Sequence, residues 1–291
     1  MTTHKKPPSV AVISSHVVRG SVGNRAAVLA LESLGLPVWA VATINLPWHP
    51  GHGPSTRIVP DDTSFNALLE DLSGSKFSQE LGAILTGYLA TPEQVKAVAA
   101  FIKTNRAQNP KLYYVCDPVI GDDTGLYVSE AIADAIRDQL LPLANVITPN
   151  RFELGWLTGK TVSTNDEIVS TVRETDVPAA LVTSAFGMLK NSTGNLFVND
   201  QVALLAEHRH VENAPNGVGD LTAALFMARQ MANQSIEDSL RATTQSVFEL
   251  LMRTQQRGAD ELTIESDIGI LRRPSVNVQI RSIGATKNHP K

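Results

Sequence analysis

The sequence is poor in cysteine and in aromatic residues. Its 291 residues include a single cysteine, Cys116, and 5% Phe, Trp and Tyr. One cysteine excludes an internal disulfide and any zinc site built on several cysteines, which fits a reducing cytoplasm. Basic residues number 25 against 29 acidic residues, so the formal net charge is -4. Without an excess of positive charge there is no long-range attraction for nucleic acid or anionic lipid, and we expect neither partner.

Long hydrophobic runs are also missing. The longest uncharged apolar stretch, residues 177–189, is shorter than the roughly 20 residues that span a bilayer. Residues 1–8 contain no apolar run of signal-peptide length. We therefore expect no transmembrane helix, no export and a cytoplasmic location.

Two widespread phosphate-binding motifs are absent as well. Residues 14–24 lack the G-x-G-x-x-G spacing of a dinucleotide-binding turn, and the P-loop pattern G-x-x-x-x-G-K-[ST] occurs nowhere. A Rossmann dehydrogenase is therefore disfavoured. Phosphate binding, if this chain has it, needs another backbone arrangement.

Alternating short β-branched runs and longer helical patterns are present from residue 10 onward. This alternation is typical of βαβ units, whose parallel strands lie buried between helices. We predict one α/β domain over residues 1–291, with a mostly parallel sheet, helices on both faces, a core over residues 9–255 and a polar C-terminal surface segment at 272–291. Strands are predicted at residues 10–14, 38–43, 83–86, 112–116, 145–148 and 180–184, and Cys116 is predicted to be a buried small hydrophobe.

Local signals add a hairpin and two helix starts. Residues 197–210 contain two strand-like runs around Asn199 and Asp200, which predicts an antiparallel hairpin. Thr91 and Thr164 stand where the N-cap of a helix is expected, and Gln94 follows Thr91 in capping-box register.

The turn Asn216-Gly217-Val218-Gly219-Asp220 precedes a strongly helical run. Two glycines allow consecutive backbone N–H groups to face one point, and a helix N-terminus stabilises negative charge there. Such a turn could hold a transferring phosphoryl group, and Asp220 could accept a hydroxyl proton. Taken alone, the same pattern also fits a simple helix cap.

Acidic and polar residues follow two predicted strands. Asp117 comes directly after one strand, and Thr148, Asn150 and Glu153 follow another. Ligands of open α/β sheets bind outside the carboxyl ends of the strands, where these side chains would meet. Asp117 and Glu153 are chemically adequate for a Mg-ATP site, since Mg²⁺ takes a few carboxylates plus water and phosphates. A turn Asp and a capping Glu are the alternative.

The segment Ser15-His16-Val17-Val18-Arg19-Gly20-Ser21-Val22-Gly23-Asn24-Arg25-Ala26-Ala27 closely resembles the N-terminal signature of pyridoxal kinases, members of the ribokinase-like superfamily. The resemblance extends over about residues 10–254. It continues in order through Thr86-Gly87-Tyr88, Cys116-Asp117-Pro118-Val119, Gly121-Asp122, Thr148-Pro149-Asn150 with Glu153, Val182-Thr183-Ser184, and Gly217-Val218-Gly219-Asp220.

The resemblance implies ATP-dependent phosphorylation of the 5'-hydroxymethyl group of pyridoxal, and often of pyridoxine and pyridoxamine, in pyridoxal 5'-phosphate salvage. It implies that Ser15 hydrogen-bonds the pyridine ring, that Val22 and Tyr88 line the substrate pocket, and that Asp220 deprotonates the hydroxyl. Nucleotide contacts are implied for Asp117, Thr148, Asn150, Glu153, Thr183, Ser184, Gly217, Val218 and Gly219, metal contacts for Asp117, Glu153 and Asp122, and the anion hole for Gly217 and Gly219. Mg²⁺, a monovalent cation such as K⁺, and a homodimer are further expectations from the resemblance.

Residues 45–53 depart from the family pattern. Pro50 stands where the family has a substrate-side threonine, so a hydroxyl and an N–H are lost, while Trp48 is expected to stack on the pyridine or to fill the loop. His49 and His52 are expected not to bind metal, because no third ligand is spaced near them. His208 and His210 are expected to be surface or lid residues.

Three alternatives stay open from the sequence. Hydroxymethylpyrimidine kinase shares the fold and the base, although its glycine turn generally continues with a cysteine that Asp220-Leu221-Thr222 lacks here. Another small-molecule kinase, acting on a sugar or nucleoside, is a second alternative. The third is a non-catalytic protein that binds pyridoxal phosphate, which the intact Asp220 and both glycines disfavour.

Overall fold

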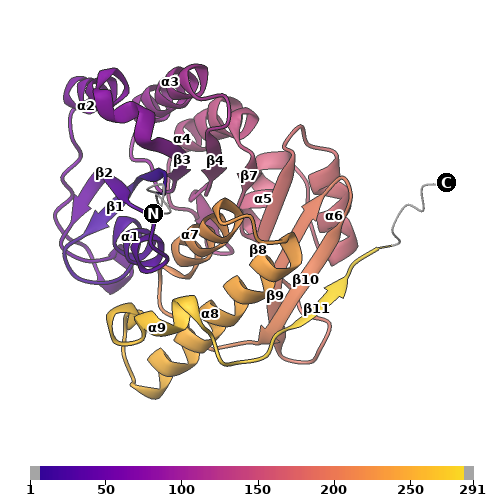
Figure 1. Ribbon diagram of the computed structural model, residues 1–291. Coiled ribbons are helices and arrows are strands. Elements are labelled where there is room, and N and C mark those ends of the chain that lie inside the picture. Colours follow the sequence, from indigo (N-terminus) through magenta and orange to yellow (C-terminus); the bar gives the residue numbers. More distant parts are fainter. Residues whose placement is uncertain (1–6, 285–291) are drawn as a thin grey trace, which may run out of the picture.

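The structure, a computed structural model, describes residues 7–284. Its strands are β1 (Ser9–Val17), β2 (Val38–Leu46), β3 (Leu81–Thr86), β4 (Tyr113–Cys116), β5 (Gly121–Asp122), β6 (Gly125–Leu126), β7 (Val146–Ile147), β8 (Ala179–Phe186), β9 (Ser192–Asn199), β10 (Ala203–Arg209) and β11 (Gln279–Ser282). The large sheet has the order β11-β10-β9-β8-β7-β4-β3-β1-β2. Strands β2, β1, β3, β4, β7 and β8 are parallel, so their carboxyl ends lie along one edge (Figure 1).

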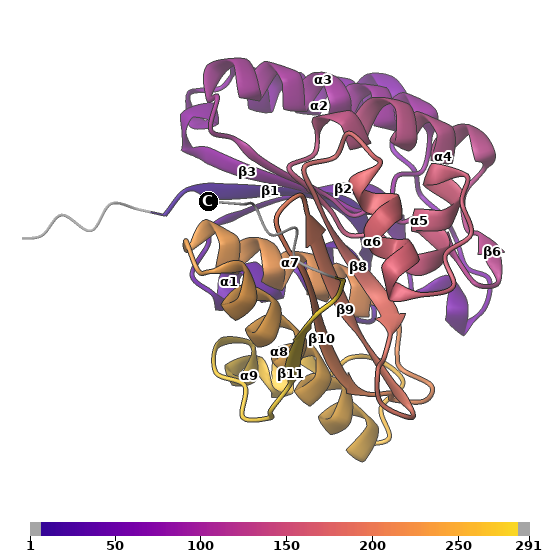
Figure 2. The same ribbon diagram turned by 90° about the vertical axis from the view of Figure 1, so that its right-hand side faces the viewer.

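Helices cover both faces of this sheet. The helices are α1 (Asn24–Ser33), α2 (Asp62–Gly74), α3 (Pro92–Gln108), α4 (Glu130–Ala135), α5 (Arg151–Thr158), α6 (Asn165–Arg173), α7 (Val218–Met231), α8 (Ile236–Gln256) and α9 (Ile268–Arg272), with short helical turns at Pro50–His52, Lys76–Glu80, Ile136–Leu140, Leu141–Leu143 and Ile264–Ser266. Figure 2 shows α2 to α6 on one side of the sheet and α1, α7, α8 and α9 on the other. The prediction of an α/β domain with helices on both faces is confirmed.

The alternation of buried residues along β1 shows why both faces are covered. Ala11 and Ile13 belong to the apolar core beneath α2 to α6, whereas Val10 and Val12 belong to the core beneath α1 and α7 to α9. Because successive side chains of a strand point to opposite faces, a strand that is apolar at every position requires a cover on each side. All six predicted strands are present, most of them longer than predicted.

The predicted hairpin is formed by β9 and β10, which pair antiparallel and extend the sheet beyond β8. The helix starts are also confirmed, since the side chains of Thr91 and Thr164 accept the N–H groups of Gln94 and Glu167. The Gln94 side chain accepts the N–H of Ala90 instead of closing a box with Thr91.

The chain beyond α8 departs from the prediction. Leu262, Ile264 and Leu271 are buried against the α7 and α8 face, so a core that ends near residue 255 is wrong. The expected polar surface segment begins inside α9 and contributes β11, which pairs with β10 at the edge of the sheet. These runs are too short and too polar to stand out in the sequence, and the sheet edge gives β11 its hydrogen-bonding partner. Residues 285–291 of that segment lie outside the described residues.

Helix α7 is held at its far end by Arg229, which is 4% exposed. Its guanidinium donates to the carbonyl of Leu225, to the hydroxyl of Ser246 on α8 and to the carbonyl of Leu271 on α9. Burial lowers the pKa of Arg229 to about 10. This network joins three helices behind the glycine turn and so holds the axis of α7.

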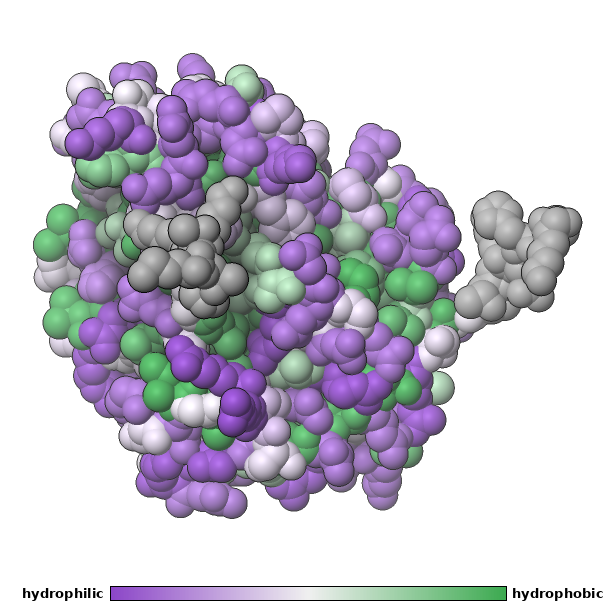
Figure 3. Space-filling model, in the orientation of Figure 1, coloured by the Kyte–Doolittle hydropathy of each residue, from purple (hydrophilic) through white to green (hydrophobic). Residues whose placement is uncertain are grey.

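The surface carries no large apolar field on the face seen in Figure 3, where hydrophilic side chains surround small, scattered hydrophobic groups. Of the helices within residues 7–284, none has both the length and the apolar character needed to cross a bilayer.

Candidate active site

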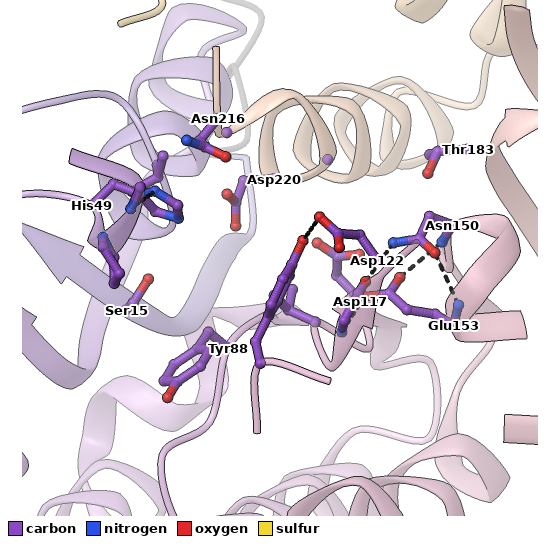
Figure 4. Close-up of a pocket in the computed structure, with 18 of the residues that line it drawn as sticks. Ser15, His49, Tyr88, Asp117, Asp122, Asn150, Glu153, Thr183, Asn216 and Asp220 are labelled. Atoms are coloured by element: carbon purple, nitrogen blue, oxygen red, sulfur yellow. Dashed lines mark hydrogen bonds between the residues drawn. The ribbon is translucent and has the colours of Figure 1, made fainter. Parts of the chain in front are cut away.

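A cavity of about 650 Å³ opens at the carboxyl edge of the parallel strands. Figure 4 shows Asp220 between two groups of side chains, with Ser15, His49 and Tyr88 on one side and the acidic cluster on the other. Of the predicted site residues, this cavity is lined by Ser15, Val22, Tyr88, Asp117, Asp122, Thr148, Asn150, Glu153, Thr183, Gly217, Gly219 and Asp220. Residues as far apart in the chain as Ser15 and Asp220 therefore meet in one place.

The glycine turn is built as the N-terminus of α7. Gly217 is the N-cap with φ 93°, a left-handed conformation, and it contributes no side-chain cap to the first-turn N–H groups. A Cβ at Gly217 would lie 2.1 Å from the carbonyl oxygen of Ser21, so only glycine allows these two segments to approach. By contrast, a Cβ at Gly219 would meet no atom within 4 Å.

Asp220 lies in the first turn of α7 and faces the cavity. Protein atoms surround most of its carboxylate, and this burial raises the pKa to about 6, although the N–H groups of Gly23 and of Asp220 itself act to lower it. A carboxylate with that pKa is mostly ionised at pH 7 and still has appreciable affinity for a proton. This is the range in which general bases work best.

Asp117 follows β4 and is 5% exposed. The Thr148 hydroxyl, at the end of β7, donates to Asp117 Oδ1 at 2.7 Å. Burial raises the pKa of Asp117 well above its usual value, and the carboxylates of Asp220 and Glu153 raise it further. Three acids thus lie close together, of which the sequence predicted Asp117 and Glu153 from adjacent strand ends and Asp220 from the glycine turn.

Glu153 is held by backbone groups on both sides. With Asn150 it forms a capping box at the start of α5, accepting the Asn150 N–H at 2.8 Å, and its other oxygen accepts the N–H of Ile120 at 3.0 Å. Burial raises the pKa of Glu153 to about 7, against the lowering effect of these N–H groups. The capping interpretation of Glu153 and its place on the cavity wall are therefore both correct.

Asp122 belongs to the small hairpin of β5 and β6, which the sequence did not predict. Its oxygens accept from the Thr124 N–H and hydroxyl and from the Tyr127 hydroxyl. Burial acts to raise the pKa of Asp122, but these hydrogen bonds outweigh it and the pKa is lowered. Asp122 lines the cavity as expected, and its nearest partners belong to its own hairpin.

The residues predicted to line the substrate pocket come from β1 and from the segments after β1 and β3. Val22 is 4% exposed and packs with Val17, Ile44 and Leu46 in a small apolar cluster. The Tyr88 hydroxyl accepts from Arg57 at 2.8 Å. This wall presents an apolar surface with a few polar groups, as small-molecule sites commonly do.

The loop at residues 45–53 differs from expectation in one respect. Trp48 does not line the cavity; its indole N–H donates to the Gly53 carbonyl, so it fills the loop. His49 and Pro50 line the cavity instead. The Gly51 N–H donates to His49 Nδ1 at 3.1 Å, and burial lowers the pKa of His49.

A second cavity of about 610 Å³ shares Asn150, Thr183 and Gly219 with the first. Ser184 and Val218, both predicted nucleotide contacts, line this second cavity. Ser184 has φ 55° at an irregularity of β8, where the pairing with β9 shifts between Val182 and Ala185. Beside the cavity, the end of β8 therefore does not pair regularly with β9.

His208 and His210 also line the second cavity, where the sequence assigned them only to the surface or a lid. The His208 ring stacks on Phe248 with centroids 4.6 Å apart, and burial lowers the pKa of His208. Other lining residues that sequence reasoning missed are Leu46, Arg57, Tyr127 and, in the second cavity, Arg151 and Phe186. No local motif marks them, because they reach the cavities only through folding.

A mostly parallel sheet, helices on both faces and a glycine turn that starts a helix at the carboxyl edge define the class of ribokinase-like kinases. A family model described as phosphomethylpyrimidine kinase matches residues 66–264. A pyridoxal kinase from Leifsonia xyli subsp. xyli is 32% identical over 283 residues, which cover 94% of this chain and 98% of the relative. A pyridoxine/pyridoxal/pyridoxamine kinase from Bordetella avium is 36% identical over 267 residues, covering 88% and 89%. The chain belongs to the pyridoxal kinase family.

Solved structures agree with this assignment. A pyridoxal kinase from Leishmania donovani, in complex with ADP and pyridoxamine, superposes with a TM-score of 0.89 at 26% identity and covers 95% of this chain and 100% of that one. The pyridoxal kinase of Entamoeba histolytica gives a TM-score of 0.88 at 25% identity, with the same coverage.

The different surroundings of Gly217 and Gly219 predict that alanine substitutions at the two positions differ in their effect on stability. We expect Gly217→Ala to lower the free energy of unfolding by roughly 2–4 kcal/mol, and the melting temperature with it. The new methyl group would be held at an unfavourable φ and would clash with the Ser21 carbonyl. Gly219→Ala is the matched control: it lies in the first turn of a helix with open space around it, so stability is expected to stay the same or rise slightly. Thermal unfolding measures both, and equal losses in the two variants would contradict this account of the turn.

The acidic wall predicts a variant that gains stability. Because burial and neighbouring carboxylates raise the pKa of folded Asp117, this group lowers the stability of the fold progressively as pH rises above the ordinary Asp pKa of about 4, and the penalty disappears as pH falls toward it. Asp117→Asn keeps an acceptor for Thr148, and without Mg²⁺ at pH 8 it should be more stable by roughly 1–2 kcal/mol. The gain should shrink toward pH 5. Asp71→Asn, on an exposed position of α2, serves as control, and a lower melting temperature for Asp117→Asn at pH 8 would refute the prediction.

Proposed function

We propose that this chain transfers the γ-phosphoryl group of ATP to the 5'-hydroxymethyl group of pyridoxal. One observation carries the proposal, which is the position of Asp220 in the cavity. On one side of Asp220 lie Ser15 and Tyr88, and on the other lie the acidic side chains; the first-turn N–H groups of α7 are adjacent. The Bordetella avium relative is named for pyridoxine, pyridoxal and pyridoxamine together, and the same three vitamers are the proposed substrates here.

In the proposed reaction, Asp220 takes the proton of the 5'-hydroxyl as the hydroxyl oxygen forms its bond to the γ-phosphorus. The bond between that phosphorus and the β–γ bridging oxygen breaks, and ADP leaves with the electron pair. Positioning and electrostatic stabilisation account for most of the catalysis in such transfers. The N–H groups at the start of α7 would stabilise the charge that develops on the phosphoryl oxygens.

The acidic wall fits a divalent cation that accompanies the nucleotide. Burial raises the pKa of Asp117, Glu153 and Asp220, and the carboxylates of Asp220 and Glu153 raise that of Asp117 further. None of the three takes part in an ion pair within residues 7–284. Within that range no three His, Cys, Asp or Glu side chains converge as a complete metal site. Mg²⁺ at nucleotide sites takes one or two carboxylates and completes its shell with water and phosphates. Asp117 and, through water, Glu153 would hold it, and it would neutralise phosphate charge.

Asp122 as a further metal contact, a K⁺ requirement, a homodimer and a cytoplasmic location stay predictions from the family resemblance. Support for the Asp122 role comes from its place on the same cavity wall. The implied contact of Ser15 with the pyridine ring rests on its place on the opposite wall.

Phosphorylation of hydroxymethylpyrimidine is the second candidate, because the matching family model carries the description phosphomethylpyrimidine kinase. The wall around Ser15, Val22 and Tyr88 carries no carboxylate and is apolar enough to accept either heterocycle. The hydroxymethyl group of either heterocycle would lie next to Asp220 in the same way. The two candidate functions therefore differ only in which substrate the enzyme prefers.

Replacement of the base tests the mechanism. We expect Asp220→Asn to lower kcat by about a thousandfold, within the range that general bases contribute, while the Kd for ADP stays within a few-fold of wild type. In the wild type, kcat/KM should fall about tenfold per pH unit below about pH 6, because protonation of Asp220 removes the base. The residual activity of the variant should lack that dependence. Asp134→Asn, an exposed acid of α4, is the control, and an Asp220→Asn rate within tenfold of wild type would remove Asp220 from this role.

A substrate panel tests the assignment and the unusual loop together. The purified enzyme should phosphorylate pyridoxal with Mg-ATP, and pyridoxal should be preferred over hydroxymethylpyrimidine. Pro50→Thr should lower the KM for pyridoxal a few-fold, because it returns a hydroxyl to the cavity wall, whereas Trp48→Phe, outside the cavity, should leave KM unchanged. If no pyridoxal, pyridoxine or pyridoxamine is turned over, the proposed function is wrong.

A further inference from the structure

The two adjoining cavities carry charges of different kinds. The first is lined by four carboxylates, Asp117, Asp122, Glu153 and Asp220, with one basic side chain, Arg57. Among the described residues that line the second cavity, Arg151 is the only Lys or Arg and Asp123 the only Asp or Glu. An anion that extends from the first cavity into the second would therefore meet Arg151 there.

Arg151 is held in place by its helix and by an aromatic ring. It is the first residue of α5 and directly follows Asn150, which lines both cavities. Its guanidinium lies 4.2 Å from the centroid of Phe186, also on the wall of the second cavity. A guanidinium stacked on a ring is already oriented, so less entropy is lost when it binds a ligand.

The donors of Arg151 are poorly used within the described chain. Its Nε is buried and has no hydrogen-bond partner. The nearest acid is Asp123, whose Oδ2 lies 4.0 Å from Nη2, and the Asp123 side chain is 84% exposed. Such a long, solvent-exposed ion pair contributes little. Because Nε has no exposed surface, a ligand in the cavity would use the other guanidinium nitrogens of Arg151, whose side chain is 31% exposed.

A second arginine that stacks on an aromatic ring, Arg137 in the turn Ile136–Leu140 after α4, provides a comparison on the surface of this chain. Arg137 lies 5.8 Å from the ring centroid of Trp156, but it pairs with Asp134 at 2.7 Å and with Asp138 at 2.8 Å. Neither cavity includes Arg137. Arg151 shares the ring contact, but it has no acid closer than 4.0 Å and it lines a cavity.

We propose that Arg151 binds the polyphosphate chain of the nucleotide in the second cavity. Phosphate oxygens match the planar fork of a guanidinium, and such charge-assisted hydrogen bonds are among the strongest in proteins. Arg151 would hold the phosphates next to Asn150, Thr183 and Gly219, which line both cavities. It thereby acts as a positioning residue for the γ-phosphoryl group that is transferred to the hydroxyl deprotonated by Asp220. The inference rests on the proposed function for the identity of the nucleotide, ATP.

Equilibrium binding tests the proposal apart from turnover. Isothermal titration calorimetry with ADP, ATP and adenosine is compared for wild type, Arg151→Gln and the matched control Arg137→Gln. Arg151→Gln should weaken ADP and ATP about tenfold and leave adenosine unchanged, because the lost contact is to phosphate. It should also make the Kd for ADP less dependent on salt. Arg151→Lys should recover part of the loss, since it keeps the charge without the planar fork, and Arg137→Gln should behave as wild type.

Two results would overturn the assignment. An ADP Kd within twofold of wild type in Arg151→Gln would show that the phosphates do not use this side chain. An equal loss of adenosine and ADP binding would place the effect at the base or ribose, or in the packing of Phe186. A wild type that binds ADP but leaves all pyridoxal vitamers unphosphorylated would defeat the proposed function alone, whereas an active wild type with an unaffected Arg151→Gln would defeat only the role of Arg151.

Discussion

The site depends on a close approach of two segments that lie almost 200 residues apart in the chain. Gly217 stands against the carbonyl of Ser21, with no room for a Cβ, and the Gly23 N–H acts to lower the pKa of the Asp220 carboxyl. Because the segment between β1 and α1 touches the start of α7 through backbone, the main chain itself sets the position of Asp220 relative to Ser15. A longer contact through side chains would leave Asp220 free to move by more than catalysis at such a site tolerates.

The same edge of the sheet concentrates negative charge at a cost in stability. Asp117, Glu153 and Asp220 all have raised pKa values because burial disfavours their charged forms. The rest of the fold compensates through two continuous apolar cores and through the Arg229 network, which fixes α7. Acids that destabilise a protein but line its cavity are typical of sites that bind a cation or transfer a proton.

Much of this arrangement could be predicted from local patterns. The six strands, the β9 and β10 hairpin and the caps at Thr91 and Thr164 each follow from residues adjacent in the chain. Asp117 was predicted at the site because it directly follows a buried strand, whose end the βαβ rule places at the ligand edge. Arg57, His49 and Arg151 carry no such signal. They reach the cavities through a loop, a short turn and a helix start whose positions depend on packing.

Local features of the sequence were enough to predict the fold class, the family and most of the residues that meet at the cavity, because periodicity, strand ends and the glycine turn involve residues adjacent in the chain. The surroundings of each residue at the cavity come from the tertiary structure. It set the pKa of Asp220 near 6 through burial, turned Trp48 away and His49 inward, and divided the site into an acidic cavity and one with Arg151. The physical reason is that burial, charge proximity and the free donors of a side chain depend on neighbours distant in the chain. The glycine turn was visible from the sequence, but its contact with Ser21 was not.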